Sequence, residues 1–287
     1  MASARSLLAL LAGLALTAAA CGGRAAPLAV DVGGFDRGNF ERSNVIDNEW
    51  LPLTPGTQST FVGSTTEEGK RIPHQLVSTV TDLTKTVDGV RVLVVWERDL
   101  SRGALEEAEL AFFAQDEHGN VWHLGEYPEV YEDGKIVEVP AWIAGTKGAR
   151  AGIAMKAEPK LGTPDYAQGY APPPVNWVDR AKVYATGVRA CVPLDCFDHL
   201  LVTREYEVGK PEASQLKYFA RGIGNVKVGW LGRNDKDHEV LQLVRRVQLT
   251  PRGLAAARAA ALRMDERAYR IRKGVYGATT RAERATS

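Results

Sequence analysis

The residues of this chain with the widest range of chemistry are its five histidines, since a histidine can act as an acid, a base or a metal ligand. They stand at positions 74, 118, 123, 199 and 238, and no two have the i, i+4 spacing with which a helix presents two metal ligands. His118 and His123 are near each other, but loop and strand positions in a predicted hairpin point them apart. We therefore predict no metal site and no cofactor.

Sequence motifs of the common catalytic mechanisms are absent from the chain. It has no Gly-x-Ser-x-Gly elbow, no His-Glu-x-x-His motif, no P-loop and no calcium loop. The segment 222–224, Gly-Ile-Gly, is half of a dinucleotide-binding motif, but no helix is predicted after it. These absences favour a protein that is not an enzyme. A carboxylate-dependent hydrolase using Asp116 or Glu126 with His123 is the alternative, because the fold and not sequence spacing places such acids.

Cys191 and Cys196 enclose four residues, Val-Pro-Leu-Asp. Outside the cytoplasm such a pair forms a disulfide by default. Closing so short a loop stabilises the fold by about 2 kcal/mol in the loop-entropy description. A zinc site would need a second pair of Cys or His ligands nearby. We therefore predict a structural disulfide.

Residues 1–20 have the pattern of a signal peptide. Arg5 is their only charged residue, and the run from Leu7 to Ala20 holds one polar side chain, Thr17. Such a run is shorter than the roughly 20 apolar residues of a transmembrane helix. The segment 18–21, Ala-Ala-Ala-Cys, resembles the lipobox of bacterial lipoproteins, with Ala18 where Leu is usual.

This lipobox resemblance implies cleavage before Cys21 and attachment of fatty acids such as palmitate to that cysteine. The alternative is an ordinary secretory signal cut after Ala20. Two or more acyl chains anchor a protein stably to a membrane. Residues 21–34 then form a flexible tether rich in Gly, Ala and Arg. We expect a protein that is lipid-anchored to the cell membrane and faces outside the cytoplasm.

The chain between residues 35 and 250 has the pattern of a single β-rich domain. Runs of alternating apolar and polar residues are joined by Asp-Gly and Gly-Asn turns, which predicts an antiparallel meander forming an open or closed barrel-like sheet. In the central hairpin, a loop at residues 116–119 would pair Phe113 with Trp122. No βαβ alternation is present, so a parallel-sheet fold is not expected. Strands are predicted at residues 57–63, 75–87, 90–97, 129–132, 135–139, 181–190, 199–207, 215–220, 224–230 and 239–249.

A basic C-terminal helix is predicted at residues 251–275, and the tail 276–287 is expected to be disordered. Thr250 is a good N-cap and Pro251 suits the first helical position. Residues 251–287 hold nine Lys and Arg against three Asp and Glu, so this helix could lie on anionic headgroups. Its apolar seam is mostly alanine, which favours docking on its own barrel. The whole chain has 36 basic and 35 acidic residues, so no nucleic-acid partner is expected.

Several segments resemble a family of secreted bacterial proteins of unknown function. Phe-Ala-Gln-Asp at 113–116 and Gly-Asn-Val-Trp-His-Leu-Gly-Glu at 119–126 match that family's Tyr-Ala-Gln-Asp…Gly-Asn-Val-Trp-Tyr-Phe-Gly-Glu core. With further matching segments, the resemblance covers most of residues 35–230. The resemblance implies a β fold and brings no activity with it. By looser analogy, the meander is similar to the open β-barrels of lipoprotein carriers.

These features predict a membrane-anchored extracytoplasmic lipoprotein that is a non-catalytic binding or envelope-associated module. Its partners would be the membrane, through the lipid anchor, and a hydrophobic small molecule or an envelope protein. A purely structural surface module is a further interpretation. Aromatic residues are the natural lining of a ligand pocket in such a barrel. The candidates are Trp96, Phe113, Trp122, Trp142 and Tyr218.

Overall fold

The computed structural model describes residues 33–67, 69–208, 210, 213–232 and 238–285. The predicted signal peptide, Cys21 and all but the last two residues of the predicted tether lie outside these residues. The helices are η1 (Arg37–Asn39), α1 (Pro251–Ile271) and α2 (Lys273–Tyr276). The strands are β1 (Thr57–Glu67), β2 (Lys70–Val87), β3 (Val90–Ser101), β4 (Ala104–Gln115), β5 (Val121–Glu132), β6 (Lys135–Glu138), β7 (Trp142–Ile143), β8 (Arg150–Met155), β9 (Tyr166–Ala167), β10 (Gly169–Tyr170), β11 (Asp179–Cys191), β12 (Cys196–Glu207), β13 (Ser214–Ala220), β14 (Gly224–Leu231), β15 (Val240–Gln248) and β16 (Glu283–Arg284).

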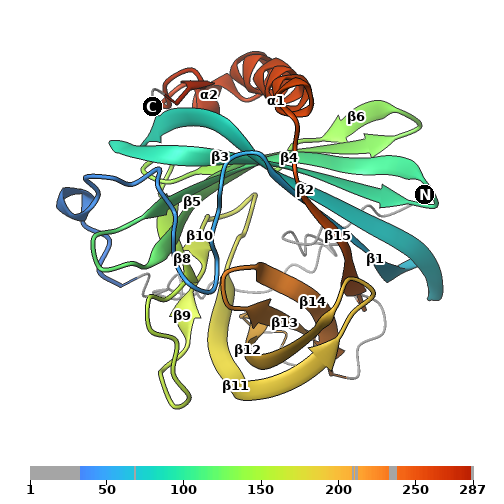
Figure 1. Cartoon of the computed structure of the whole chain (residues 1–287). Helices are drawn as coiled ribbons and strands as arrows, with labels where there is room; N and C mark the ends of the chain where they lie inside the picture. The colour runs from blue at the N-terminus through green and yellow to red at the C-terminus, as the bar shows by residue number, and fades with distance from the viewer. Residues whose placement is uncertain (1–32, 68, 209, 211–212, 233–237, 286–287) are drawn as a thin grey trace, which may run out of the picture.

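The strands form one antiparallel sheet that curls into an almost closed barrel (Figure 1). Their order is β10-β8-β5-β4-β3-β2-β1-β15-β14-β13-β12-β11-β9. Most neighbours are also consecutive in sequence, as expected of a meander. The mainly β fold with a barrel-like antiparallel sheet and a C-terminal helix is therefore confirmed.

A short segment at residues 166–170 joins the two ends of the sheet. Its first half, β9, pairs with β11, and its second half, β10, pairs with β8. Gly152 on β8 permits this close approach, because a Cβ there would lie 2.1 Å from the backbone nitrogen of Gly169. Gln168, between the two half-strands, donates its backbone N–H to the carbonyl oxygen of Asp179 at 2.9 Å. This segment therefore bridges the two ends of the sheet and almost closes the ring of strands.

The central hairpin differs in register from the prediction. Phe113 pairs with His123, whereas Trp122 pairs with Ala114. The cause is a loop of residues 116–120, one residue longer than predicted, in which the backbone N–H of Asp116 donates to the carbonyl oxygen of Asn120. A β-bulge at Leu124, opposite Phe112 and Phe113, then shifts the register again. The predicted pairing of Phe113 with Trp122 is wrong by one residue. Phe113 and His123 consequently share the inner face of the sheet.

The outer face of strands β2 to β5 carries an apolar cluster that is covered by α1 (Figure 1). Helix α1 begins at its N-cap Thr250, whose Oγ1 accepts a hydrogen bond from the N–H of Gly253. Its buried apolar residues are Ala257, Ala261, Met264 and Ala268, the predicted alanine seam. Helix α1 therefore docks on its own barrel. The predicted helix 251–275 is broken at Arg272, after which α2 begins.

Ionic contacts also hold α1 to the barrel. Lys85 and Asp265 form an ion pair of 2.7 Å in which both side chains are buried, and Arg267 binds Glu129 through two hydrogen bonds.

The tail expected to be disordered is instead ordered as far as residue 285, because β16 pairs with β2. Cys191 and Cys196 form the predicted disulfide. Within the described part of the chain, no helix is long and apolar enough to cross a membrane.

Candidate functional site

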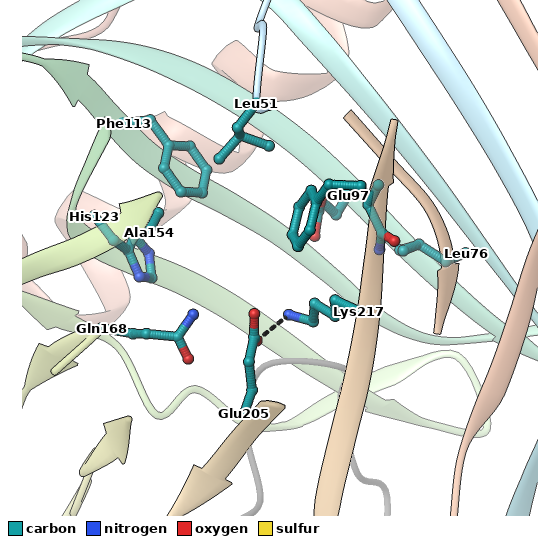
Figure 2. A pocket seen from close by; sticks show the side chains of 11 residues that line it. Leu51, Leu76, Glu97, Phe113, His123, Ala154, Gln168, Glu205 and Lys217 are labelled. Carbon is teal, nitrogen blue, oxygen red and sulfur yellow. Dashed lines mark ion pairs between the residues drawn. The ribbon is translucent and has the colours of Figure 1, made fainter. Parts of the chain in front are cut away.

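The barrel interior holds a cavity of about 140 Å³ with both apolar and charged walls (Figure 2). It is lined by Leu51, Leu76, Glu97, Phe113, His123, Ala154, Gln168, Glu205, Lys217, Phe219 and Asn225. A second cavity of about 140 Å³ adjoins it, since the two share Leu51, Leu76, Glu97, Phe113 and Asn225. The second cavity also contains Arg246, and burial lowers the pKa of this guanidinium.

Strand periodicity places the charged side chains inside the barrel. Neighbouring residues in a strand point to opposite faces, so Glu97 faces inward while Trp96 and Arg98 face outward, where the Arg98 guanidinium lies 4.4 Å from the Trp96 ring. In the same way β12 presents Glu205 and β13 presents Lys217 to the cavity. These residues were not predicted from the sequence, because a single charged residue in a strand of alternating polar and apolar residues normally faces solvent.

The most prominent contact in the cavity is an ion pair between Lys217 and Glu205. The ammonium nitrogen lies 2.7 Å from the carboxylate, and the two side chains are 14% and 10% exposed. Figure 2 shows both side chains pointing into the cavity. Burial alone would lower the pKa of Lys217, but the carboxylates of Glu205, Glu97 and Asp179 outweigh it and raise that pKa. Lys217 is therefore a firmly charged ammonium.

Carboxyl groups outnumber cations around Lys217. Burial raises the pKa of Glu97, and the hydrogen bond from Ser78 and the charge of Lys217 only partly oppose this. Burial, with repulsion from Glu207 and Glu205, raises the pKa of Asp179 to about 7. Crowded carboxyl groups whose pKa values are raised by burial and by each other are a physical sign of a functional site.

A second group of carboxyls lies beside His123. The His123 Nε2 is 3.8 Å from Glu126 Oε2, and both side chains are buried. Burial, then repulsion from Glu107, raises the pKa of Glu126 well above the usual range, and burial, then repulsion from Glu126 and Glu107, does the same for Glu109. Burial lowers the pKa of His123 to about 3, so its imidazole is neutral at physiological pH. Among the described residues, His123 Nε2, Glu126 Oε2 and Glu109 Oε1 have no hydrogen-bond partner.

Aromatic rings surround this group. The His123 imidazole stacks on Phe113 with 5.0 Å between ring centroids, and it meets the edge of Trp142 at the same distance. Trp177 packs against Trp142 at 5.8 Å. Neither indole nitrogen makes a well-formed hydrogen bond within the described part of the chain, although the Trp142 side chain is close enough to Glu126 to oppose the rise in the pKa of that acid. Buried polar atoms of this kind are rare in folded proteins, and each calls for an explanation.

A separate buried network is centred on His74. Its Nε2 lies 3.1 Å from Asp99 and 3.3 Å from Glu239, and its Nδ1 lies 2.9 Å from the Oγ of Ser101. Burial opposes the charged form, but hydrogen bonds to Asp99 and Glu239 raise the pKa of His74 to about 10. The Ser101 hydroxyl donates to Glu106 at 2.6 Å. A charged His74 cannot take a proton from Ser101, so this is an ion-pair network and not a nucleophilic triad.

The structure places the five candidate pocket-lining aromatic residues in different parts of the fold. Phe113 lines both cavities. Trp142 packs beside His123 but does not line either cavity. Trp96 and Trp122 lie instead on the outer face, in the apolar cluster under α1, while Tyr218 packs in another apolar cluster beneath the Lys227 ammonium.

The candidate hydrolase residues are only partly brought together. Glu126 and His123 converge, whereas Asp116 lies in the hairpin turn and accepts hydrogen bonds from Asn120 and from the indole nitrogen of Trp122 at 2.7 Å. That role is structural. Across the described residues, no group of three or more His, Cys, Asp and Glu side chains is arranged to hold a metal ion.

Comparisons with known proteins give two distant likenesses. One is to a Bacteroides fragilis protein assigned as exported with a YmcC-like fold: 14% identity, TM-score 0.40, covering 70% of this chain and 99% of that one. The other is to a Parabacteroides distasonis protein assigned as a lipoprotein: 11% identity, TM-score 0.33, covering 70% of this chain and 100% of that one. Both TM-scores are low, so no property is carried over from either protein. No family model and no curated protein matches the sequence.

Proposed function

We propose that this protein is a lipid-anchored extracytoplasmic binding protein whose barrel interior holds a small molecule. The lipobox-like segment ending at Cys21 supports the anchor. The Cys191–Cys196 disulfide suits an oxidising compartment. The observation that carries the binding proposal is the interior cavity, which combines apolar walls with the buried charges of Glu205 and Lys217.

The size and lining of the cavity narrow the class of ligand. Pockets for drug-sized ligands measure about 300–1,000 Å³, whereas each of the two adjoining cavities measures about 140 Å³. A benzene-sized molecule fills an engineered cavity of about 150 Å³. A long acyl chain is therefore too large for this site as it stands. A small amphipathic molecule, with a ring-sized apolar part and a polar head group, fits the mixed lining.

Three related probes test the binding proposal by titration calorimetry: benzylammonium, benzyl alcohol and benzoate, added to the full chain in detergent. We expect at least one of them to bind with one-to-one stoichiometry. Ala154→Phe fills the first cavity and should abolish that binding, and Asn225→Phe provides a second cavity-filling variant. Ala104→Phe makes the same change at an exposed position and should bind normally. If no probe binds, or if filling the cavity changes nothing, the proposal fails.

A carboxylate-dependent hydrolase is a second candidate, favoured by the convergence of Glu126 and His123 in the barrel. A carboxyl group with a raised pKa can act as a general acid. Glu126→Gln would then abolish turnover of a small ester or glycoside while leaving its binding intact. A binding protein shows no turnover with either the wild-type chain or the variant, so the two functions are distinguished by product formation.

A further inference from the structure

The hydrogen-bonding atoms left over in the barrel define the chemistry of a ligand head group. His123 Nε2, Glu126 Oε2 and Glu109 Oε1 have no partner in the described residues, and these residues are only 2%, 1% and 3% exposed. His123 lines the first cavity, and Glu126 lies 3.8 Å behind its Nε2. Leaving such atoms unpaired in the folded protein is unfavourable. A ligand that reaches them should therefore bring hydrogen-bond donors.

From these atoms we infer that the ligand is a small organic cation with a primary ammonium head group, bound beside His123 in the first cavity. This inference rests on the proposed binding function. An ammonium offers three N–H donors and no acceptor, whereas a neutral imidazole can accept at Nε2 and a carboxylate accepts at both oxygens. Hydrogen bonds between an ammonium and a carboxylate are also roughly twice as strong as neutral ones.

The charges around the first cavity also favour a cationic ligand. The first cavity is lined by the carboxyls of Glu97 and Glu205 against one ammonium, Lys217, which is already paired with Glu205. Glu126 adds a carboxyl group behind His123, and Glu109 is close enough to Glu126 to interact with it electrostatically. An incoming cation would therefore form an ion pair with one of these carboxyl groups, which would otherwise be protonated or lack a partner of opposite charge. Among the described residues that line the two cavities, the one guanidinium is that of Arg246, in the second cavity.

The apolar walls suit the rest of such a ligand. Phe113 and Phe219 face the first cavity, and the edge of Trp142 lies next to His123. Aromatic faces attract cations as well as apolar groups. A benzylic or short alkyl ammonium can therefore place its carbon part against these rings while its nitrogen points toward Glu126.

The three benzyl probes, measured on the full chain, test the charge of the ligand because they share one ring and differ in the head group. We expect benzylammonium to bind about tenfold tighter, or more, than benzyl alcohol and benzoate, which is about 1.4 kcal/mol. Glu126→Gln should lower the affinity for benzylammonium by a similar factor and leave that for benzyl alcohol unchanged. Glu97→Gln serves in its place if Glu126→Gln does not fold. The matched control is Glu158→Gln, since Glu158 is exposed and does not line the cavity.

The possible outcomes separate this inference from the proposed function. Equal binding of benzylammonium and benzyl alcohol, abolished by Ala154→Phe, would keep the binding function and overturn the cation inference. Tightest binding of benzoate would mean that Arg246 selects the ligand, and would also overturn it. An unchanged affinity in Glu126→Gln and Glu97→Gln would show that these carboxyls do not recognise the head group. Absence of binding by all three probes would overturn both.

Discussion

Replacing Lys217 by methionine should destabilise the barrel by leaving the Glu205 carboxylate without its partner. Methionine has a similar shape, so little packing is lost. Breaking a buried ion pair costs about 3–5 kcal/mol, because the remaining charge stays desolvated. The two side chains are 14% and 10% exposed, which allows some hydration and places the expected loss near the lower end, at about 3 kcal/mol.

Urea unfolding of the wild type, Lys217→Met, Glu205→Gln and the double variant measures this energy as a double-mutant cycle. Glu205→Gln removes the charge but keeps an oxygen for the hydroxyl of Thr203, which donates to Glu205 at 3.1 Å. It should cost less than Lys217→Met, because Lys217 retains the neighbouring carboxylate of Glu97. The double variant should lose less than the sum of the single losses, with a coupling energy of about 1–3 kcal/mol.

The pair between Lys160 and Glu158 is the matched control for this cycle. Its nitrogen–oxygen distance is 2.6 Å, close to that of Lys217 and Glu205, but its side chains are 72% and 76% exposed. Exposed pairs are screened by water, so the same substitutions there should show no measurable coupling. Additive losses at Lys217 and Glu205, equal to those of the exposed pair, would refute the view that burial gives the interior pair its strength.

Three further predictions concern the anchor, the His74 network and the closure of the barrel. Cys21→Ala should abolish fatty-acid labelling and release the chain from the membrane fraction, whereas a secreted protein without an anchor would be unaffected. Burial disfavours a charged His74, but Asp99 and Glu239 raise its folded pKa from 6.5 to about 10. This stabilisation is complete below pH 6.5 and is lost as pH rises toward 10, so the Tm of the wild type should fall over that range and that of His74→Gln should fall less. Gly152→Ala should open the barrel, because its Cβ would lie 2.1 Å from the Gly169 backbone; reduced hydrogen-exchange protection of residues 166–170 would show it, with Gly253→Ala as the control.

The strands could be predicted from sequence because period-two alternation is a local signal. The predicted strand at residues 90–97 is observed as Val90–Ser101, and the one at residues 215–220 as Ser214–Ala220. Asp88-Gly89 and Asp133-Gly134 occupy turns in which both residues have positive φ, the conformation that such dipeptides favour. Where the predicted and observed ends of a strand differ, polar residues continue the backbone pairing of the sheet beyond the apolar pattern.

The register of the central hairpin could not be predicted because the sequence does not distinguish a loop of residues 116–119 from one of residues 116–120. The longer loop pairs Phe113 with His123, which places His123 inside the barrel and Trp122 outside it, and a bulge at Leu124 follows. The candidate site depends on this shift, since it brings His123 next to Glu126 and Phe113. The ordered tail was missed for a similar reason: Glu283 and Arg284 pair with β2 across almost 200 residues of sequence.

The interior charges were missed because sequence patterns treat a strand's polar face as the solvent face. In this barrel the relation is partly reversed for strands β3 to β5. One set of their apolar residues, such as Val94 and Phe112, faces outward against α1. Their acids, such as Glu97 and Glu109, face inward together with Val95 and Phe113. Without α1, this outward face would be a large exposed apolar patch.

Helix α1 therefore has a role beyond covering one side of the sheet. A barrel of this size usually draws its stability from an apolar interior. Here a large part of the apolar packing lies between the sheet and α1, in the cluster that includes Phe112, Tyr127, Met264 and Tyr276. Because that packing is outside the barrel, the interior can hold ion pairs and unpartnered polar atoms, which reduce stability but can bind a ligand. The basic C-terminal helix therefore does not contribute charge to the cavity. Its packing on the outer face stabilises the fold and compensates for the unfavourable burial of polar groups in the cavity.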